Sequence, residues 1–279
     1  MSTIYKSEAG ASEIRRHYQE ALHTWPVPAE HVRIPTREGE TFVVVSGPED
    51  APPLLLLHGS GTNTTTWLAD IASWARHFRT YAVDVIGEPG LSAPSRPSLV
   101  SDAHALWLDD LLDGLGITSA SIVGTSLGGW LALDYATRRP ERVSRLALLC
   151  PGGLGRQKNG WLVGALLLRL FGPGGLRRSA RTVTGLDTPE ARPVLDSVAL
   201  TFAHFKPRTE RVPLFSGSTL GRLTMPVLVI AGSRDVLFDS AGTARRVRQC
   251  MPHARVNLLP EAGHAILGQT DSVLAFLRE

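Results

Sequence analysis

The chain contains 279 residues, of which 43% are apolar, and its 29 Lys and Arg against 26 Asp and Glu give a net charge of +3. This composition predicts a globular protein with ample apolar material for a core. The chain has neither the strongly basic balance nor the sequence motifs of a nucleic-acid-binding protein, so we expect no nucleic-acid partner.

The sequence shows no targeting segment, membrane span or metal motif. Residues 1–22 are charged and lack the apolar stretch typical of a secretory signal. The longest apolar run, residues 161–171, is shorter than the about 20 residues needed to cross a bilayer. We therefore expect a cytoplasmic protein without a membrane span. Cys150 and Cys250 belong to no CxxC or Cys/His cluster, so we expect no metal or redox site.

The first element expected along the chain is a helix over residues 12–25. Ser12 is a suitable N-cap. Apolar residues recur at helical spacing and define one face: Ile14, Tyr18, Leu22 and Trp25. Pro26 and Pro28 end this helix.

Strand-like and helix-like segments then alternate through most of the chain. After strands at 31–35 and 41–46 comes PLLLLHG over residues 53–59, a continuous apolar run typical of a strand buried on both faces of a parallel sheet. Further strands are expected at 80–84, 121–124, 143–149, 227–231 and 255–259, and helices at 67–77, 99–115, 127–138, 241–251 and 265–278. The alternation predicts an α/β fold with a mostly parallel sheet of about eight strands, flanked by helices.

The alternation breaks within residues 153–222, where Gly, Pro and Arg are frequent. We interpret this stretch as a helical lid inserted after the sixth strand, with residues 1–152 and 223–279 forming the core. The 161–171 segment is then a lid helix facing the substrate or, alternatively, an interfacial segment. The stretch holds eleven Lys and Arg against four Asp and Glu. This charge is either solvated surface charge or a field that steers anionic substrates.

The strongest chemical signal is the G-x-S-x-G motif formed by Gly124, Ser126 and Gly128, between a strand-like and a helix-like segment. A strand that turns this sharply into a helix forces its central residue into strained backbone angles, and a Cβ on the flanking glycines would clash. The motif therefore predicts Ser126 as a nucleophile. A dinucleotide-binding loop is the alternative, but Ser126 stands where G-x-G-x-x-G needs its second glycine.

A serine nucleophile needs a base and an orienting acid, which follow in the order Ser, Asp or Glu, His in chains with this turn. Asp235 follows the apolar strand VLVIA, and His264 follows the last strand. Because strand C-termini meet at one edge of a parallel sheet, we expect both side chains beside Ser126. Asp239 is an alternative for the acid.

The HGSG segment of residues 58–61 follows the first buried strand. Acyl transfer places negative charge on a carbonyl oxygen, which two backbone N–H groups can stabilise. We expect the N–H groups of Leu127 and Ser60 in this role, with Gly61 as an alternative to Ser60. His58 is expected to pack and form hydrogen bonds beneath the loop.

Together these motifs resemble the α/β-hydrolase family. The matching segments are LLLLHGSG, YAVDVIGEPGLS, IVGTSLGGWLALDYATRRPERV, PVLVIAGSRD and LLPEAGH. The resemblance implies a hydrolase that uses Ser126, Asp235 and His264 as its triad and carries a lid after its sixth strand. ALHTWPVP and DVIGEPGLSAPSRP are also similar to a bacterial branch of carboxylesterases. The family often has a proline where this chain has Asp239, and relatives that open epoxides or displace halide use an aspartate in place of Ser126.

The expected activity is hydrolysis of carboxylic esters through an acyl-enzyme, without a metal or organic cofactor. Small-molecule esters are the expected substrates, selected by apolar lid walls from Leu162, Leu166, Leu167, Phe171, Phe202 and Phe205. C–C bond hydrolysis, lactone hydrolysis and perhydrolysis on the same triad are alternatives, as is a protein that binds a small ligand without turnover. The sequence predicts no particular oligomeric state.

Overall fold

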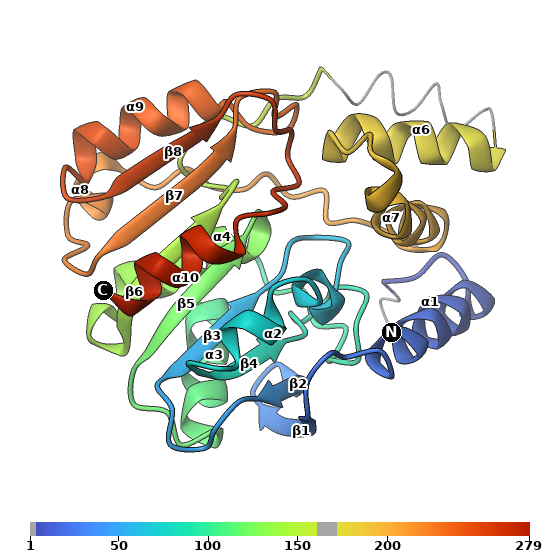
Figure 1. Cartoon of the computed structure of the whole chain (residues 1–279), viewed down its shortest axis with the longest axis horizontal. Coiled ribbons are helices and arrows are strands. Elements are labelled where there is room, and N and C mark those ends of the chain that lie inside the picture. The colour runs from blue at the N-terminus through green and yellow to red at the C-terminus, as the bar shows by residue number, and fades with distance from the viewer. Residues whose placement is uncertain (1–3, 161–171) are drawn as a thin grey trace.

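The computed structural model describes residues 4–160 and 172–279, and its centre is an eight-stranded sheet (Figure 1). The strands lie in the order β1-β2-β4-β3-β5-β6-β7-β8. β2 is antiparallel to both of its neighbours, whereas the pairs from β4 to β8 are parallel. The predicted fold class, a mostly parallel sheet flanked by helices, is confirmed.

The strands begin and end close to the predicted positions. They are β1 (Ala29–Thr36), β2 (Gly39–Ser46), β3 (Pro53–Leu57), β4 (Arg79–Val83), β5 (Ala120–Thr125), β6 (Val143–Leu149), β7 (Val227–Gly232) and β8 (Arg255–Leu259). In β3, Leu55 and Leu57 belong to one apolar cluster, and Leu54 and Leu56 belong to the other. Because successive side chains of a strand point to opposite faces, this run is buried on both sides of the sheet.

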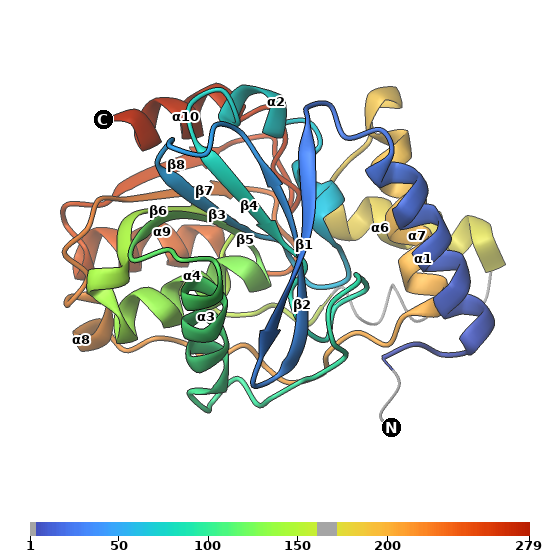
Figure 2. The same ribbon diagram turned by 90° about the horizontal axis from the view of Figure 1, so that it is seen from below.

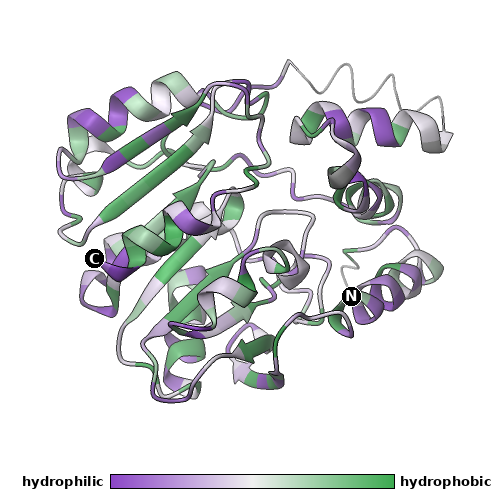
Figure 3. Ribbon diagram, viewed as in Figure 1, coloured by the Kyte–Doolittle hydropathy of each residue, from purple (hydrophilic) through white to green (hydrophobic). Residues whose placement is uncertain are grey.

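Helices cover both faces of the sheet. They are α1 (Glu8–Leu22), α2 (Ile71–Trp74), α3 (Ala103–Gly114), α4 (Leu127–Arg138), α6 (Gly172–Thr184), α7 (Arg192–His204), α8 (Gly217–Leu220), α9 (Ser240–Cys250) and α10 (Thr270–Arg278), with 3-10 turns η1 (Thr64–Trp67), η2 (Pro140–Arg142) and η4 (Pro189–Ala191). α3, α4 and α9 contribute side chains to one apolar cluster, and α1, α2 and α10 contribute to the other. Figure 2 shows α3 and α4 on one side of the sheet and α2 and α10 on the other. The central strands are hydrophobic, whereas α9 presents many hydrophilic residues (Figure 3). Within the described ranges, no helix is both long and apolar enough to cross a membrane.

The N-terminal helix begins earlier than the sequence pattern predicts. α1 starts at Glu8, and its N-cap is Ser7 rather than Ser12: the Ser7 hydroxyl accepts a hydrogen bond from the N–H of Gly10 (3.1 Å). A cap must satisfy an N–H of the first turn, which Ser12 cannot do from the interior of the helix. The predicted apolar stripe is buried up to the last residue of the helix: Ile14, Tyr18 and Leu22.

The stretch between β6 and β7 carries α6, α7 and α8. α6 and α7 pack on each other, and α1 packs on α7, away from the sheet (Figure 1). A small apolar cluster joins α1 to α7: Ile4, Tyr5, Ala11, Ile14 and Phe205. α8 instead contacts α9, and Leu220 lies in a core cluster. The assignment of residues 153–222 as a lid stays a prediction, and its 161–171 segment lies outside the described residues.

Candidate active site

Ser126 lies at the turn between β5 and α4. Its φ of +52° and ψ of −111° are angles that L-residues rarely adopt, and such strain persists only where the surrounding structure imposes it. An added Cβ on Gly124 would lie 2.5 Å from the carbonyl oxygen of Gly128, and one on Gly128 would collide with the carbonyl oxygen of Leu57. Both glycines are therefore needed for the close approach of α4 to the sheet, as the motif predicts.

Three side chains from distant parts of the chain meet at this turn. The Oγ of Ser126 is 2.9 Å from Nε2 of His264, and Nδ1 of His264 is 2.8 Å from Oδ2 of Asp235. Asp235 follows β7 and His264 follows β8, at the carboxyl ends of the parallel strands. The imidazole bridges the hydroxyl and the carboxylate, which is the arrangement that activates a serine for attack.

The surroundings of Asp235 favour its ionised form. Its side chain is 1% exposed, and this burial acts to raise its pKa. The hydrogen bond and charge of His264, with the N–H groups of Leu237 and Phe238, outweigh burial and hold the pKa below its usual range. Those two N–H groups donate to Oδ1 at 2.7 and 3.1 Å. An ionised carboxylate orients the imidazole and stabilises it when it takes a proton.

Asp239, the alternative acid, has a different role. Its Oδ1 accepts the N–H of Gly242 (3.0 Å), which makes Asp239 the N-cap of α9. Its other oxygen faces Arg245 at 3.9 Å. The structure therefore places Asp235, and not Asp239, against the imidazole of His264.

Cys150 lies beside the Asp235–His264 pair. Its Sγ, a carboxylate oxygen of Asp235 and a ring nitrogen of His264 lie within 4.8 Å of one another. Burial, reinforced by the charge of Asp235, raises the pKa of the thiol well above its usual range, so the sulfur stays protonated. Both ring nitrogens of His264 are already engaged, and a metal ion would have to displace a hydrogen bond to Asp235 or to Ser126. We therefore assign Cys150 a structural role.

The backbone N–H groups of Leu127 and Ser60 are available to a substrate oxygen. In the described part of the chain neither donates a hydrogen bond. Leu127 begins α4, directly after the nucleophile. Gly59 brings the second loop close, since an added Cβ there would lie 3.2 Å from Cβ of Ser126. The two predicted oxyanion donors therefore lie on two segments that both approach the serine.

Gly61, the alternative donor, is already occupied. Its N–H donates to Oε2 of Glu88 at 2.6 Å, and the hydroxyl of Ser60 donates to the same oxygen at 3.1 Å. An N–H that is bound to a buried carboxylate cannot also bind a substrate oxygen in the same geometry. The geometry therefore favours Ser60 over Gly61.

His58 supports the same loop from beneath. Burial lowers its pKa to about 4, against the opposing effect of its hydrogen bond with Gly59. The N–H of Val85 donates to Nε2 (2.9 Å), so Nδ1 carries the proton and donates to the carbonyl oxygen of Gly59 (2.9 Å). The neutral ring packs and forms hydrogen bonds beneath the loop, as the sequence predicts.

The stretch between β6 and β7 contacts two loops of the site. Nζ of Lys158 donates to the carbonyl oxygen of Asp235 (2.8 Å). The N–H of Ala265, next to the imidazole, donates to the carbonyl oxygen of Thr184 at the end of α6 (2.9 Å). These contacts tie the predicted lid to the loops that carry the acid and the base.

α7 lies close to the loop of residues 58–61, which carries Ser60. It does not supply the apolar wall that the sequence predicts at the end of α7. Cγ2 of Thr201 lies 3.7 Å from the place of a Cβ added to Gly61. Phe205, predicted to line the lid, is 1% exposed and packs edge-on against Tyr5, with ring centroids 6.2 Å apart. That prediction was wrong because α1 docks on α7 and covers the ring. Phe202 is half-buried, and the other predicted wall residues lie outside the described residues: Leu162, Leu166, Leu167 and Phe171.

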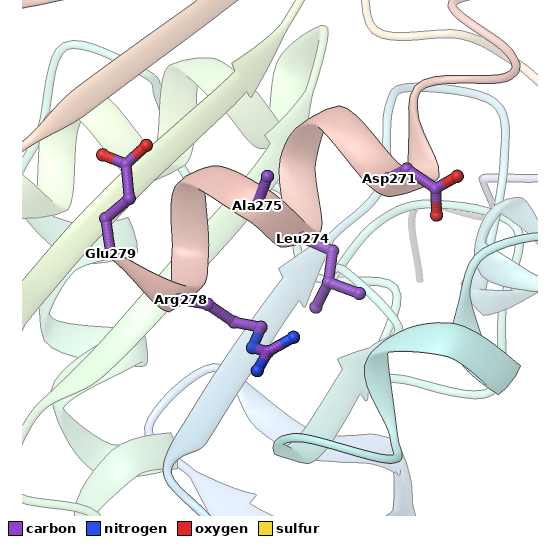
Figure 4. Close-up of a pocket in the computed structure, with 5 residues that line it drawn as sticks. All are labelled: Asp271, Leu274, Ala275, Arg278 and Glu279. Atoms are coloured by element: carbon purple, nitrogen blue, oxygen red, sulfur yellow. The ribbon is translucent and has the colours of Figure 1, made fainter.

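An open hollow along α10 does not involve the site (Figure 4). Its lining is largely charged and comes from α10 and the residue after it: Asp271, Leu274, Ala275, Arg278 and Glu279. Ser126, Asp235 and His264 do not line this hollow, and we assign it no function.

Two residues that contact the site were missed by sequence reasoning. Glu88 reaches the loop after β3, and Lys158 reaches the loop after β7. The one local signal for Glu88 is an acidic residue inside an apolar, glycine-rich turn, GEPG, where a solvated charge is unexpected. Lys158 carries no comparable signal, because its partner is a main-chain carbonyl.

The sheet order, the strained serine between a strand and a helix, and the acid and base after later strands define the α/β-hydrolase class. The model of the Alpha/beta hydrolase family matches residues 54–276 of this chain. The chain therefore belongs to the alpha/beta hydrolase family.

Similar proteins cover nearly the whole chain. The chain is 32% identical over 275 residues to the uncharacterized carboxylesterase nap of Bacillus subtilis (strain 168), which covers 89% of this chain and 85% of that protein. The solved structure of carboxylesterase CesB (YbfK) from Bacillus subtilis is 28% identical, with a TM-score of 0.85 over 96% of this chain and 98% of that one. The naproxen esterase (carboxylesterase NP) of the same organism is 28% identical, with a TM-score of 0.82 over 98% of each chain.

Proposed function

We propose that this chain is a serine hydrolase that cleaves small-molecule carboxylic esters, with Ser126 as nucleophile, His264 as base and Asp235 as orienting acid. The observation that carries the proposal is the continuous path of 2.9 and 2.8 Å contacts from hydroxyl to imidazole to carboxylate. The similarity to proteins named carboxylesterases supports an ester as the reacting group. The cytoplasmic location expected from the sequence stays a prediction.

The reaction consists of two acyl transfers. Oγ of Ser126 attacks the ester carbonyl while Nε2 of His264 takes its proton, and the N–H groups of Leu127 and Ser60 bind the oxyanion, each worth about 3–4 kcal/mol. The imidazolium, stabilised by Asp235, protonates the leaving alcohol. Water then attacks the acyl-enzyme by the same steps and releases the acid. This chemistry requires no cofactor.

The basic residues of the proposed lid are in part neutralised. Arg177 and Arg181 in α6 pair with Asp196 and Asp187 at 2.9 and 3.0 Å. Both arginine side chains are more than half exposed, at 67% and 58%. These pairs favour solvated surface charge over the steering of anionic substrates.

The proposal is tested by Ser126→Ala, a panel of p-nitrophenyl esters and a fluorophosphonate label. The native protein should hydrolyse esters and take up the label. Ser126→Ala should lose at least about a thousandfold in kcat, because triad members act as a unit, while circular dichroism and thermal unfolding stay native. A Ser126→Ala protein with native kinetics would overturn the proposal. Labelling without hydrolysis of any ester would favour C–C, lactone or peracid chemistry on the same triad.

A further inference from the structure

The loop after β4 braces the loop that carries Ser60. The N–H of Val85 donates to Nε2 of His58, and Nδ2 of Asn63 donates to the carbonyl oxygen of Pro89 (3.1 Å). Glu88 lies between these two contacts along the chain. The two loops are therefore joined at successive positions, and Glu88 provides the contact nearest to Ser60.

Glu88 holds this loop through a single carboxylate oxygen. Its Oε2 accepts the N–H of Gly61 at 2.6 Å and the hydroxyl of Ser60 at 3.1 Å. Glu88 is 1% exposed, and its Oε1 is buried without a hydrogen-bond partner among the described residues. A charged acceptor makes shorter and stronger hydrogen bonds than a neutral one. Burying a carboxylate is costly, so a buried one with only two donors suggests a specific task.

These two contacts fix Ser60 on both sides of its Cα atom. One contact holds its side chain, and the other holds the peptide that follows it, where Gly61 has a left-handed φ of +72°. The N–H of Ser60 itself makes no hydrogen bond in the described part of the chain. The carboxylate thus orients the Ser60 backbone and leaves its N–H available.

We propose that Glu88 is a positioning residue for the oxyanion donor: its carboxylate anchors the hydroxyl of Ser60 and the N–H of Gly61, so that the N–H of Ser60 points at the substrate oxygen. The proposal rests on the function proposed above. Glu88 makes no hydrogen bond to the nucleophile in the described part of the chain, and it acts by holding Ser60 and Gly61.

The groups around Glu88 compensate part of its burial. Burial raises its pKa to about 7, while the Gly61 N–H, Arg96, the Ser60 hydroxyl and Arg208 all act to lower it. Burial chiefly raises the pKa of Tyr5, and the charge of Glu88 adds to that effect. When Glu88 is ionised, the two guanidinium groups offset a negative charge that would otherwise oppose the oxyanion of the reaction.

The test uses two variants of similar size. Glu88→Gln keeps an acceptor oxygen for both donors and should retain kcat within about threefold. Glu88→Met keeps the volume but has no comparable acceptor, and kcat should fall about 10-fold to 100-fold with KM nearly unchanged, because only transition-state binding is weakened. A trifluoromethyl ketone, whose oxygen occupies the oxyanion position in its serine adduct, should lose affinity for Glu88→Met by a similar factor.

Glu210→Ala is the matched control. Glu210 also accepts one hydroxyl, from Ser98 (2.7 Å), and one backbone N–H, from Leu99 (3.1 Å), on a different loop. Glu210 is half-buried and pairs with Arg208 (3.2 Å). Its removal leaves the contacts of Glu88 with Ser60 and Gly61 in place, so kcat and inhibitor affinity should stay within about twofold of native. Circular dichroism and thermal unfolding establish that each variant is folded.

A folded Glu88→Met protein with native or higher kcat would overturn the inference, as would an equal kcat loss in Glu210→Ala. If Glu88→Met does not fold, Glu88→Asp replaces it. The shorter side chain moves the carboxylate away from Gly61, so we expect a loss of kcat. A native kcat in Glu88→Asp would contradict the inference. Failure of the proposed function is seen separately: the native chain would then hydrolyse no ester and take up no label at Ser126.

Discussion

At the residue scale, the roles of Asp235 and Asp239 can be separated by experiment. Asp235→Asn should lower kcat about ten-thousandfold, because an amide does not hold the imidazole in the tautomer that accepts the serine proton. Asp239→Ala removes only the N-cap of α9 and should lower the free energy of unfolding by about 1 kcal/mol, with kcat nearly native. Steady-state kinetics and urea unfolding of both variants measure these effects. A large kcat loss in Asp239→Ala alone would reverse the assignment.

The sequence allows Ser126, Asp235 and His264 to be proposed because each carries a local signal. Each follows a strand, and parallel strands end at one edge of the sheet. Glu88 could not be assigned in this way, because its contact with Gly61 joins two loops whose relative position depends on the folded sheet. The choice between Ser60 and Gly61 follows from that same contact and needs the structure.

At the element scale, the packing of α4 on β3 depends on the absence of a side chain at Gly128. A Cβ there would collide with the carbonyl oxygen of Leu57 and lie 2.5 Å from that of His58. Gly128→Ala should therefore lower the free energy of unfolding by about 1–3 kcal/mol and displace Ser126, with loss of activity. Gly160→Ala is the control, because nothing lies within 4 Å of a Cβ at that exposed position. Equal urea midpoints for the two variants would contradict this account of the turn.

Element boundaries can be predicted from the sequence where a local signal sets them. They cannot be predicted where contacts between distant segments set them. The run in β3 and the helix after Ser126 match the prediction because apolar pattern and glycines define them. α10 begins at Thr270, not at residue 265, since the segment after His264 contacts Thr184 of α6 through Ala265 instead of entering a helix. Docking of α1 on α7, which buries Phe205, is likewise a contact between distant segments that no periodicity indicates.

At the scale of the whole molecule, four buried titratable groups have opposing effects on how the stability of the fold changes with pH. Burial lowers the pKa values of His58 and His104 to about 4, and it raises those of Asp84 to about 6 and of Glu88 to about 7. Between about pH 4 and 6.5, each histidine is largely protonated in the unfolded chain but neutral in the folded chain. The contribution of the histidines to stability therefore rises with pH over this interval. For the carboxyls, the folded chain keeps a proton that the unfolded chain releases, so their contribution falls over nearly the same interval. These two pairs of groups therefore act in opposite directions over this pH range.

Glu88→Gln should disturb this balance in a predictable direction. The carboxyl of Glu88 titrates near its usual value of 4.5 in the unfolded chain and at about 7 in the folded one. The native protein therefore loses about 3 kcal/mol of stability from this group as pH rises through that window, and Glu88→Gln does not. Relative to native, the variant should gain about that much between pH 4.5 and 8, measured as the change in free energy of urea unfolding with pH. Glu210→Gln is the control, because the pKa of Glu210 is lowered. The difference in free energy of unfolding between this variant and the native protein should therefore change little with pH, or change in the opposite direction. A pH-independent difference between Glu88→Gln and native would show that Glu88 does not titrate with a raised pKa in the folded chain.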